Sequence, residues 1–366
     1  MGNKSNLEIM VSLPHFRNYF EGKKVFLTGH TGFKGSWLLQ ILAMCNAEIK
    51  GFSLAPQKEI DLYNQIDGDR LCDSIIHDLR DAEFLKKEIV DFQPDYIFHL
   101  AAQPLVIEGY QNPLYTFEVN TQGTANVLDA IRGLEKPCVA VMITTDKVYE
   151  NHDDNSLFHE EDKLGGYDPY SASKAACEIV ISSYRNSFFN PKNYDDHQKV
   201  IVSMRAGNVI GGGDYADNRI IPDIIKSIQQ NELLTLRNPL ATRPWQHVLE
   251  PLGVYLLVAT KAFDHPLDFA TSYNIGPEKE DILSVENLTQ IAIETMQKGQ
   301  YEIAKEAPKL HEAATLMLDI SKIKKEMNWL PKWNAKQAIQ NTILWYVNEE
   351  NATSKCTAEI KNYFNI

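Results

Sequence analysis

The segment VFLTGHTGFKGS, residues 25–36, predicts a strand that runs through a tight turn into a helix. Three glycines, Gly29, Gly32 and Gly35, follow the apolar run in a GxxGxxG spacing. The first permits the turn, the second lets the backbone approach a pyrophosphate, and the third allows close packing of helix on strand. We expect an amphipathic helix, with apolar residues at positions 38, 39, 42 and 45. A glycine-rich turn alone is usually only a turn, but with a strand before and a helix after it the motif favours dinucleotide binding.

Strand-like runs alternate with helical patterns along the first 205 residues. The runs cover 25–28, 48–52, 74–78, 96–101, 139–145 and 200–205. This alternation predicts an α/β fold, a Rossmann-like doubly wound parallel sheet, because parallel strands need helical crossovers. Ligands bind at the carboxyl edge of such sheets, so the residues that follow the strands are the candidates for a site.

Beyond residue 208 the pattern changes to shorter elements punctuated by Gly and Pro, including GGG at 211–213 and RPW at 243–245. We therefore expect a dinucleotide-binding domain over 1–207, with 1–20 as an N-terminal extension. A smaller C-terminal substrate-binding domain would cover most of 208–366, discontinuously, with part of it returning to the Rossmann-like domain. No flexible linker separates them, so the two regions are expected to share a cleft.

Composition excludes several classes of protein. A net charge of −13 argues against sequence-independent binding of nucleic acid, which requires clustered Lys and Arg. No apolar run reaches the roughly 20 residues of a membrane span, and the N-terminus lacks the apolar core of a signal peptide. The five cysteines contain no CxxC pair, so we expect reduced thiols, a cytoplasmic protein and no metal site.

Two motifs point to chemistry at the carboxyl edge. Thr145, Asp146 and Lys147 end an apolar run, and Tyr170 and Lys174 lie one helical turn apart in YSASK. Lowering a tyrosine pKa from about 10 to about 7 requires roughly 4 kcal/mol, which a buried lysine and an oxidised nicotinamide together can supply. Chance Tyr–Lys pairs and surface Asp–Lys pairs are the alternatives, and the apolar strand and the glycine motif favour a functional site.

The choice between a dinucleotide with a free ribose 2′-hydroxyl and one with a 2′-phosphate stays open. The second strand ends in GFSLA, residues 51–55, with neither an acid for a ribose hydroxyl nor an arginine for a 2′-phosphate. Asp78 and Leu79 follow the third strand, where a carboxylate can accept from adenine; a turn role for Asp78, with Asp81 as a helix N-cap, is equally compatible. Ala101, Ala102 and Gln103 end the fourth strand with small side chains that suit a close cofactor.

Longer motifs resemble a known family. TGHTGFKGSW, HLAAQPL, TTDKVYE, LGGYDPYSASK, RAGNVIGGGDYADNRIIPDII and RNPLATRPWQHVLEP are similar to the extended short-chain dehydrogenase/reductase family and, within it, to the CDP-glucose 4,6-dehydratases. The likeness runs from residue 21 to about residue 346. It implies a tightly held NAD, a nucleotide-sugar substrate and a homodimer formed through helices near 115–132 and 170–185.

The resemblance also implies roles for single residues. Tyr170, aided by Lys174, would take the proton of the sugar 4-hydroxyl, and Thr145 would hydrogen-bond the 4-oxygen. Asp146 would be the acid at the departing 6-hydroxyl, and Lys147 stands where many sugar 4,6-dehydratases carry the glutamate base. The implied cofactor contacts, besides Tyr170 and Lys174, are Gly29, Thr31, Gly32, Phe33, Gly35, Asp78, Leu79, Ala101, Ala102 and Gln103.

A nucleoside diphosphate needs cations and planar donors, and arginine offers a fork matched to phosphate oxygens. The substrate-side candidates are Asn208, Arg219, Arg237, Arg243 and His311. The sequence departs from the family where an arginine is expected, at Ile107 and Glu108, and lacks tryptophans over 151–158. The sugar and the base therefore stay open, and the competing functions are a 4-epimerase, which needs no acid at C6, and a non-catalytic nucleotide sensor.

Overall fold

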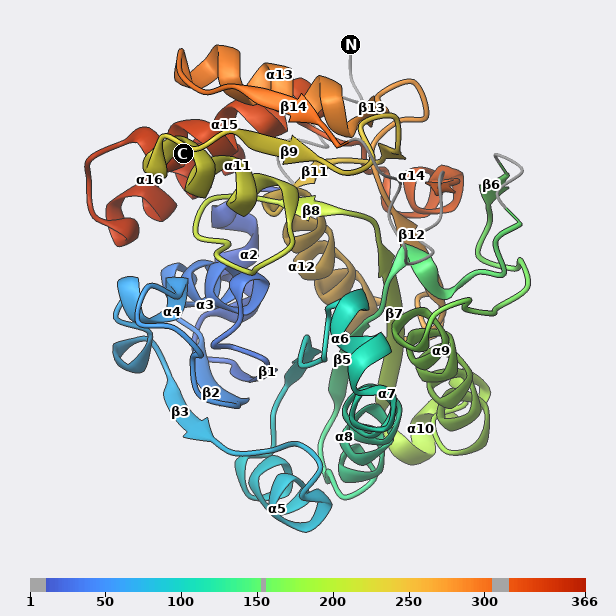
Figure 1. The fold of residues 1–366 in the computed structure, drawn as a ribbon. Coiled ribbons are helices and arrows are strands. Elements are labelled where there is room, and N and C mark those ends of the chain that lie inside the picture. The colour runs from blue at the N-terminus through green and yellow to red at the C-terminus, as the bar shows by residue number, and fades with distance from the viewer. Residues whose placement is uncertain (1–10, 153–155, 305–315) are drawn as a thin grey trace.

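The computed structural model describes residues 11–152, 156–304 and 316–366. Its centre is a parallel seven-stranded sheet in the order β12-β7-β5-β4-β1-β2-β3 (Figure 1). The chain winds outward from β1 in both directions, as in dinucleotide-binding sheets, and the predicted Rossmann-like fold is confirmed. The strands are β1 (Lys24–Thr28), β2 (Glu48–Ser53), β3 (Asp73–Ile76), β4 (Tyr96–His99), β5 (Cys138–Ile143), β7 (Lys199–Ala206) and β12 (Ser272–Ile275).

Burial explains which sequence runs became central strands. Every residue of β4, β5 and β7 is buried, because helices cover both faces of the sheet and a strand there has no polar side. Several predicted runs extend beyond the strand: Asp78 lies after β3, Ala101 after β4, and Thr145 after β5. These residues are therefore outside the ladder and lie at the carboxyl edge.

Two sets of helices cover the sheet. Phe16, Trp37 and Leu256 belong to the core on one face, and Leu85, Val127 and Ile181 to the core on the other. The first face carries α2 (Leu13–Phe20), α3 (Phe33–Met44), α12 (Leu249–Asp264), α14 (Ser321–Met327) and α16 (Ala352–Phe364). The second carries α5 (Ala82–Phe92), α8 (Gly123–Ile131) and α9 (Pro169–Ser187).

The helix after the glycine turn differs from the expectation. The sequence predicts an amphipathic helix, yet α3 is buried from Gly35 to Leu42 without a polar face. The reason is tertiary: α2, α12 and α16 contact α3 on the sides that the sheet leaves open. A helix packed on all sides carries no periodic polar signal in its sequence.

A third apolar cluster forms a smaller unit at the carboxyl edge, above the sheet in Figure 1. Ile224, Leu288 and Ile339 are among its buried residues, from α11 (Ile220–Gln230), α13 (Val285–Met296) and α15 (Ala335–Val347). Four two-stranded pairs complete the described chain: β6 (Leu157–Phe158) with β15 (Met317–Leu318), β8 (Val209–Ile210) with β11 (Gln246–His247), β9 (Leu234–Leu236) with β14 (Tyr301–Ile303), and β10 (Thr242–Arg243) with β13 (Leu283–Ser284).

The list of predicted strands was incomplete. The seventh strand, β12, pairs with β7 although about 65 residues separate them, with Asn274 opposite Arg205. Only four residues long, it follows a loop and gives no alternating pattern of its own. Short helical segments lie between the main elements: α4 (Leu62–Gln65), η1 (Gly68–Arg70), α6 (Val106–Gln111), α7 (Pro113–Phe117), η2 (Glu118–Gln122), η3 (Asp146–Val148), η4 (Pro191–Asn193) and α10 (Tyr194–His197).

Within the described ranges, no helix has the length and apolar content needed to span a bilayer. The five cysteines are free thiols, and all except Cys72 are buried.

Candidate active site

The glycine turn opens between the ends of β2 and β4, because Thr28 lies in register with Phe52 and His99. Gly29 has φ +75°, and a Cβ there would lie 2.7 Å from the Ala101 amide nitrogen. A Cβ at Gly35 would lie 1.9 Å from the Gly29 carbonyl oxygen. Both positions therefore require glycine.

The same turn leaves room and donors for a dinucleotide phosphate. A Cβ at Gly32 would meet only the Gly29 carbonyl oxygen, at 3.4 Å, so the backbone there is accessible. Gly32 is the N-cap of α3, and no side chain caps this helix. Its first amide groups are thus available to an anion, and the turn fits a pyrophosphate.

The ends of β2 and β3 are held by local hydrogen bonds. Thr31 Oγ1 lies 2.8 Å from Ser53 Oγ and donates to the Leu54 carbonyl oxygen, which fixes the turn against β2. Asp78 accepts from the Arg80 side chain, and this contact lowers the pKa of the carboxyl group. Asp81 N-caps α5 through the Phe84 amide, as the turn interpretation required.

The candidates after β4 differ in what they offer. Ala101 and Ala102 are partly buried and small, and the Ala101 amide donates to Thr28 Oγ1 over 3.2 Å. The Gln103 side chain is engaged within the protein, because its amide nitrogen donates to Thr116 and its oxygen accepts from the Leu105 amide. Gln103 can thus contribute its backbone to a site, while its side chain holds the loop.

Thr145 and Asp146 lie at the tip of β5. Thr145 is the N-cap of η3, and its hydroxyl donates to Asp146 Oδ1 over 2.9 Å. Asp146 is 2% exposed, so burial raises the pKa of its carboxyl group, while Lys147, Thr145 and Arg243 act in the opposite direction. Burial thus favours the protonated form of this carboxyl group, which is the form a general acid needs. Lys147 is partly buried next to it.

Tyr170 and Lys174 lie on α9, which begins firmly because Asp168 caps it and Pro169 takes its first position. Both side chains are buried, at 8% and 5% exposure. Burial raises the pKa of Tyr170 to about 12, while a hydrogen bond with Thr145 and the charge of Arg219 lower it. Thr145, Asp146 and Tyr170 are thereby brought together, as predicted from the sequence.

Lys174 sits one turn further along the helix, where its Nζ donates to the Ile143 carbonyl oxygen over 3.2 Å. Burial lowers the pKa of its ammonium group, against the charges of Cys177 and Glu178. The ammonium thus contacts the backbone of β5 in this structure, and the Tyr170 phenol shares a hydrogen bond with Thr145 at the strand tip.

One residue of the site was missed from the sequence. Lys34, within the glycine motif itself, donates from Nζ to the Tyr255 hydroxyl over 2.9 Å. Burial lowers the pKa of Lys34 to about 7, helped by the charges of Lys174 and Arg219. A lysine in the first turn of an otherwise apolar helix is the signal that could have found it.

Not all of the substrate-side candidates lie near Asp146 and Tyr170. Arg243 is buried and acts on the pKa of Asp146, and Arg219 pairs with Asp214 at 2.9 Å and acts on Tyr170. Asn208 is partly buried, and its carbonyl oxygen accepts from the Gln246 amide. Arg237 is exposed after β9. His311 lies outside the described residues.

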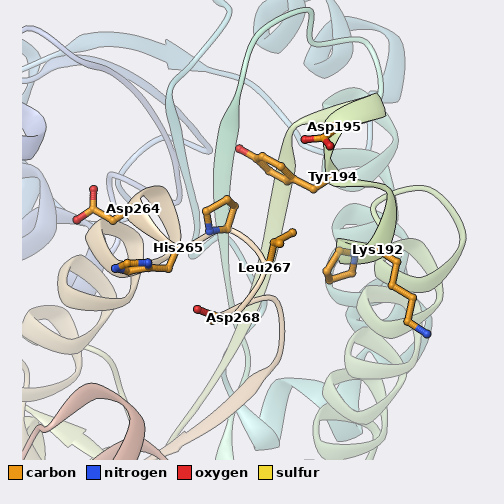
Figure 2. Close-up of a pocket in the computed structure, with 9 residues that line it drawn as sticks. Lys192, Tyr194, Asp195, Asp264, His265, Leu267 and Asp268 are labelled. Atoms are coloured by element: carbon orange, nitrogen blue, oxygen red, sulfur yellow. The ribbon is translucent and has the colours of Figure 1, made fainter.

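A hollow of about 510 Å³ lies elsewhere (Figure 2). It is lined by residues 191, 192, 194, 195 and 264–268, which precede β7 and β12, so it sits at the amino edge of the sheet. It is open and lined by Asp195, Asp264 and Asp268 together with Lys192 and His265. Because the candidate catalytic residues lie at the opposite edge, this hollow is separate from the site.

Comparison with known proteins agrees with this geometry. A sequence profile described as GDP-mannose 4,6 dehydratase matches residues 26–342. The chain is 40% identical over 330 residues to the CDP-glucose 4,6-dehydratase of Salmonella typhimurium, covering 90% of this chain and 92% of that protein.

Solved structures share the fold at lower identity. The dTDP-glucose 4,6-dehydratase of Bacillus anthracis, in complex with NAD, aligns with a TM-score of 0.72 at 21% identity, covering 90% of this chain and 98% of that one. The UDP-glucose 4-epimerase of Thermus thermophilus, also with NAD, gives 0.74 at 24% identity, covering 89% and 100%. The resemblance seen in the motifs is confirmed: the chain belongs to the GDP-mannose 4,6 dehydratase family, within the extended short-chain dehydrogenases/reductases.

Proposed function

We propose that the protein is an NAD-dependent nucleotide-sugar 4,6-dehydratase that converts CDP-glucose to the 4-keto-6-deoxy sugar. The observation that carries the proposal is the buried Asp146 carboxyl group, which shares the strand tip with Thr145 and lies near the Tyr170 phenol. The 40% identity to a CDP-glucose 4,6-dehydratase supports the substrate.

The first step needs a base and a polarised oxygen at C4. Tyr170 takes the proton of the 4-hydroxyl, and Thr145, which already contacts Tyr170, hydrogen-bonds the 4-oxygen. A bound NAD would supply the acceptor for the C4 hydride and its return to C6, so the reaction would consume no net cofactor. Lys174 stabilises the phenolate by its positive charge.

The second step is loss of water across C5 and C6. The 4-ketone makes the C5 proton acidic, and Lys147, whose charge acts on the neighbouring Asp146, would remove it. Asp146 gives its proton to the departing 6-hydroxyl, which leaves as water. Burial raises the pKa of Asp146 and so favours the protonated form that this step needs, because the charged form is costly without water. A proton returned to C5 completes the product.

The remaining residues would bind the two ligands. The turn of Gly29, Gly32 and Gly35 would hold the cofactor pyrophosphate. Thr31, Phe33, Asp78, Leu79, Ala101, Ala102 and the Gln103 backbone would line the rest of the cofactor groove. On the substrate side, Arg243 and Asn208 would contact the diphosphate, with Arg219 closer to the sugar because its charge acts on Tyr170. Arg237 and His311 are the weakest members of this proposed set.

We also propose that residues 208–366 mainly form the substrate-binding unit, from the separate core of α11, α13 and α15. From the same half of the chain, α12 packs on one face of the sheet and β12 forms its edge strand. Such a division would put the substrate-binding unit over the carboxyl edge of the sheet.

Assembly as a homodimer is part of the proposal. Leu114, Phe117, Ile179 and Phe188 are exposed on α7 and α9 or just after them, and these helices pack against each other. A paired copy would cover this apolar face. We further propose a cytoplasmic location and a role in forming deoxysugars for surface polysaccharide. Both agree with a nucleotide-activated substrate.

A 4-epimerase would use Tyr170 and Lys174 without an acid for C6, so the buried Asp146 favours the dehydratase. The test is incubation of the NAD-loaded protein with CDP-, UDP- and GDP-hexoses, with product mass and alkaline absorbance as readouts. Loss of water from CDP-glucose supports the proposal. An unchanged mass with a changed sugar configuration would identify an epimerase, and faster turnover of a UDP- or GDP-hexose would refute the cytidine assignment.

A further inference from the structure

The catalytic face of α9 continues one turn beyond the residues assigned above. Tyr170, Lys174 and Glu178 follow each other at four-residue steps, so they share one face of the helix. Each contacts the end of β5: Tyr170 meets Thr145, Lys174 meets the Ile143 carbonyl oxygen, and Glu178 accepts from Thr144 Oγ1 over 2.5 Å. Glu178 thus makes the third contact of this face with the strand.

Glu178 is 2% exposed, and both of its carboxylate oxygens are used. Oε1 accepts from Thr144, and Oε2 accepts from Ser203 Oγ over 2.9 Å and from Arg205 Nη2 over 2.8 Å. Arg205 is itself 4% exposed, on β7. One carboxylate oxygen is therefore bonded to Thr144, directly after β5, and the other to β7, so the carboxylate cannot turn without breaking a charged contact.

The partner of Glu178 reaches the loop that follows the site. Arg205 Nη1 donates to the Tyr149 hydroxyl and to the Glu160 carbonyl oxygen, each over 2.8 Å. The Tyr149 hydroxyl donates to Asn274 Oδ1 over 2.6 Å. One buried network thus fixes both ends of the segment 144–149 that carries Thr145, Asp146 and Lys147.

We propose that Glu178 is a positioning residue of the reaction, which holds the Tyr170–Lys174 face of α9 in register with the tip of β5. The inference rests on the dehydratase function proposed above. Its carboxylate oxygens contact Thr144, Ser203 and Arg205 rather than the reacting groups, so Glu178 acts through Thr144 and through its charge on Lys174.

Its charge has a second effect, on Lys174. The titratable groups that interact electrostatically with this ammonium are Cys177 and Glu178 from α9, His99 from β4 and Lys34 from α3. Burial keeps His99 neutral, and Lys34 carries no negative charge. Glu178 therefore supplies negative charge that favours the ammonium form of Lys174. Removing that charge lowers the pKa of Lys174 further, and activity that needs the ammonium is then lost at a lower pH.

Glu178→Gln keeps the shape and removes the charge. In the NAD-loaded enzyme with CDP-glucose we expect kcat to fall about tenfold at a nearly unchanged KM, because the reacting groups are misplaced. The alkaline limb of the kcat profile should move down by about one pH unit. Glu88→Gln, which removes a carboxylate from the Lys50 ion pair on the distant β2 and α5, is the matched control and should change neither.

Thr144→Val separates position from charge. It removes the donor to Glu178 Oε1 and keeps the carboxylate, so kcat should fall several-fold while the alkaline limb stays in place. A folded Glu178→Gln enzyme with an unmoved limb, or a Thr144→Val enzyme with the kcat of the wild type, overturns the proposal. If Glu178→Gln does not fold, the Thr144→Val result decides.

Hydrogen exchange of residues 143–149 tests the positioning without any substrate. Glu178→Gln should exchange faster in this segment and Glu88→Gln should not. If the wild type turns over no nucleotide sugar, the proposed function fails. The exchange result then stands by itself: equal rates in Glu178→Gln and the wild type refute the positioning role, and faster exchange supports it.

Discussion

Tyr170→Phe removes a single oxygen atom from the proposed site. Gly109 packs against the backbone and Cβ of Tyr170, which the substitution leaves in place. Thr145 loses its contact with the phenol, yet its hydroxyl still donates to Asp146 Oδ1 over 2.9 Å. No buried donor is stranded, so the free energy of unfolding should change by about 1 kcal/mol or less.

The effect on catalysis should be far larger. Burial holds the pKa of Tyr170 at about 12, and a base that works at about pH 7 must be stabilised as phenolate by roughly 7 kcal/mol. Lys174 and the bound cofactor must provide that stabilisation. Without the hydroxyl there is no phenolate for them to stabilise. Loss of a general base lowers the rate by about 10²- to 10⁴-fold, equivalent to roughly 3–5 kcal/mol of barrier.

The assay is the rate of 4-keto-6-deoxy sugar formation at saturating CDP-glucose, alongside NAD binding and denaturant unfolding of the same samples. Tyr184→Phe is the matched control, since this tyrosine lies on the same helix about four turns beyond Tyr170 and contacts Phe188. NAD binding should survive in both variants. If Tyr170→Phe with bound NAD kept more than a tenth of the wild-type rate, the assignment of the base would be wrong.

Other perturbations test separate parts of the site. Asp146→Asn should still oxidise C4 but stall before water leaves, so reduced-nicotinamide absorbance should accumulate; its absence with both ligands bound would count against the acid role. Gly35→Ala should abolish NAD binding measured by equilibrium dialysis, because its Cβ would lie 1.9 Å from the Gly29 oxygen, whereas Gly253→Ala, whose nearest neighbour is at 3.4 Å, should bind normally. Arg205→Met should lower the free energy of unfolding by about 3–5 kcal/mol in denaturant titrations, because Glu178 is left charged and buried. Since the pKa of Glu178 is held below its ordinary 4.5, the contribution of this pair is complete above that pH and is lost as the pH falls through the lower folded value.

The glycine turn shows what local sequence can predict. Gly29 and Gly35 are required by contacts within a dozen residues or with the adjacent strand, so their spacing alone indicated the geometry. The same holds for Asp168 and Pro169, which begin α9 and set Tyr170 and Lys174 on one face. In each case the residues that determine the structure are close in the chain.

Long-range packing accounts for what was missed. The strand β12 exists because β7 offers it a free edge, and the burial of α3 on all sides depends on α12 and α16, which come over 200 residues later. Lys34 became part of the site only when α12 brought Tyr255 to its ammonium. No periodicity in the sequence records such contacts, because they depend on elements that fold onto the sheet from elsewhere.

Burial shifts the pKa values of the proposed catalytic groups, and the shift favours the proposed acid but opposes the proposed base. For Asp146 it raises the pKa, which favours the protonated form that an acid needs. For Tyr170 the same burial raises the pKa toward 12, away from the state that a base needs, and for Lys174 it disfavours the ammonium that would help. Burial therefore favours the form of Asp146 that donates a proton, whereas Tyr170 needs neighbouring positive charge before it can act as a base. Glu178, which is paired with Arg205 one helical turn beyond Lys174, supplies negative charge that favours the ammonium, and the proposed positioning role rests on this buried ion pair.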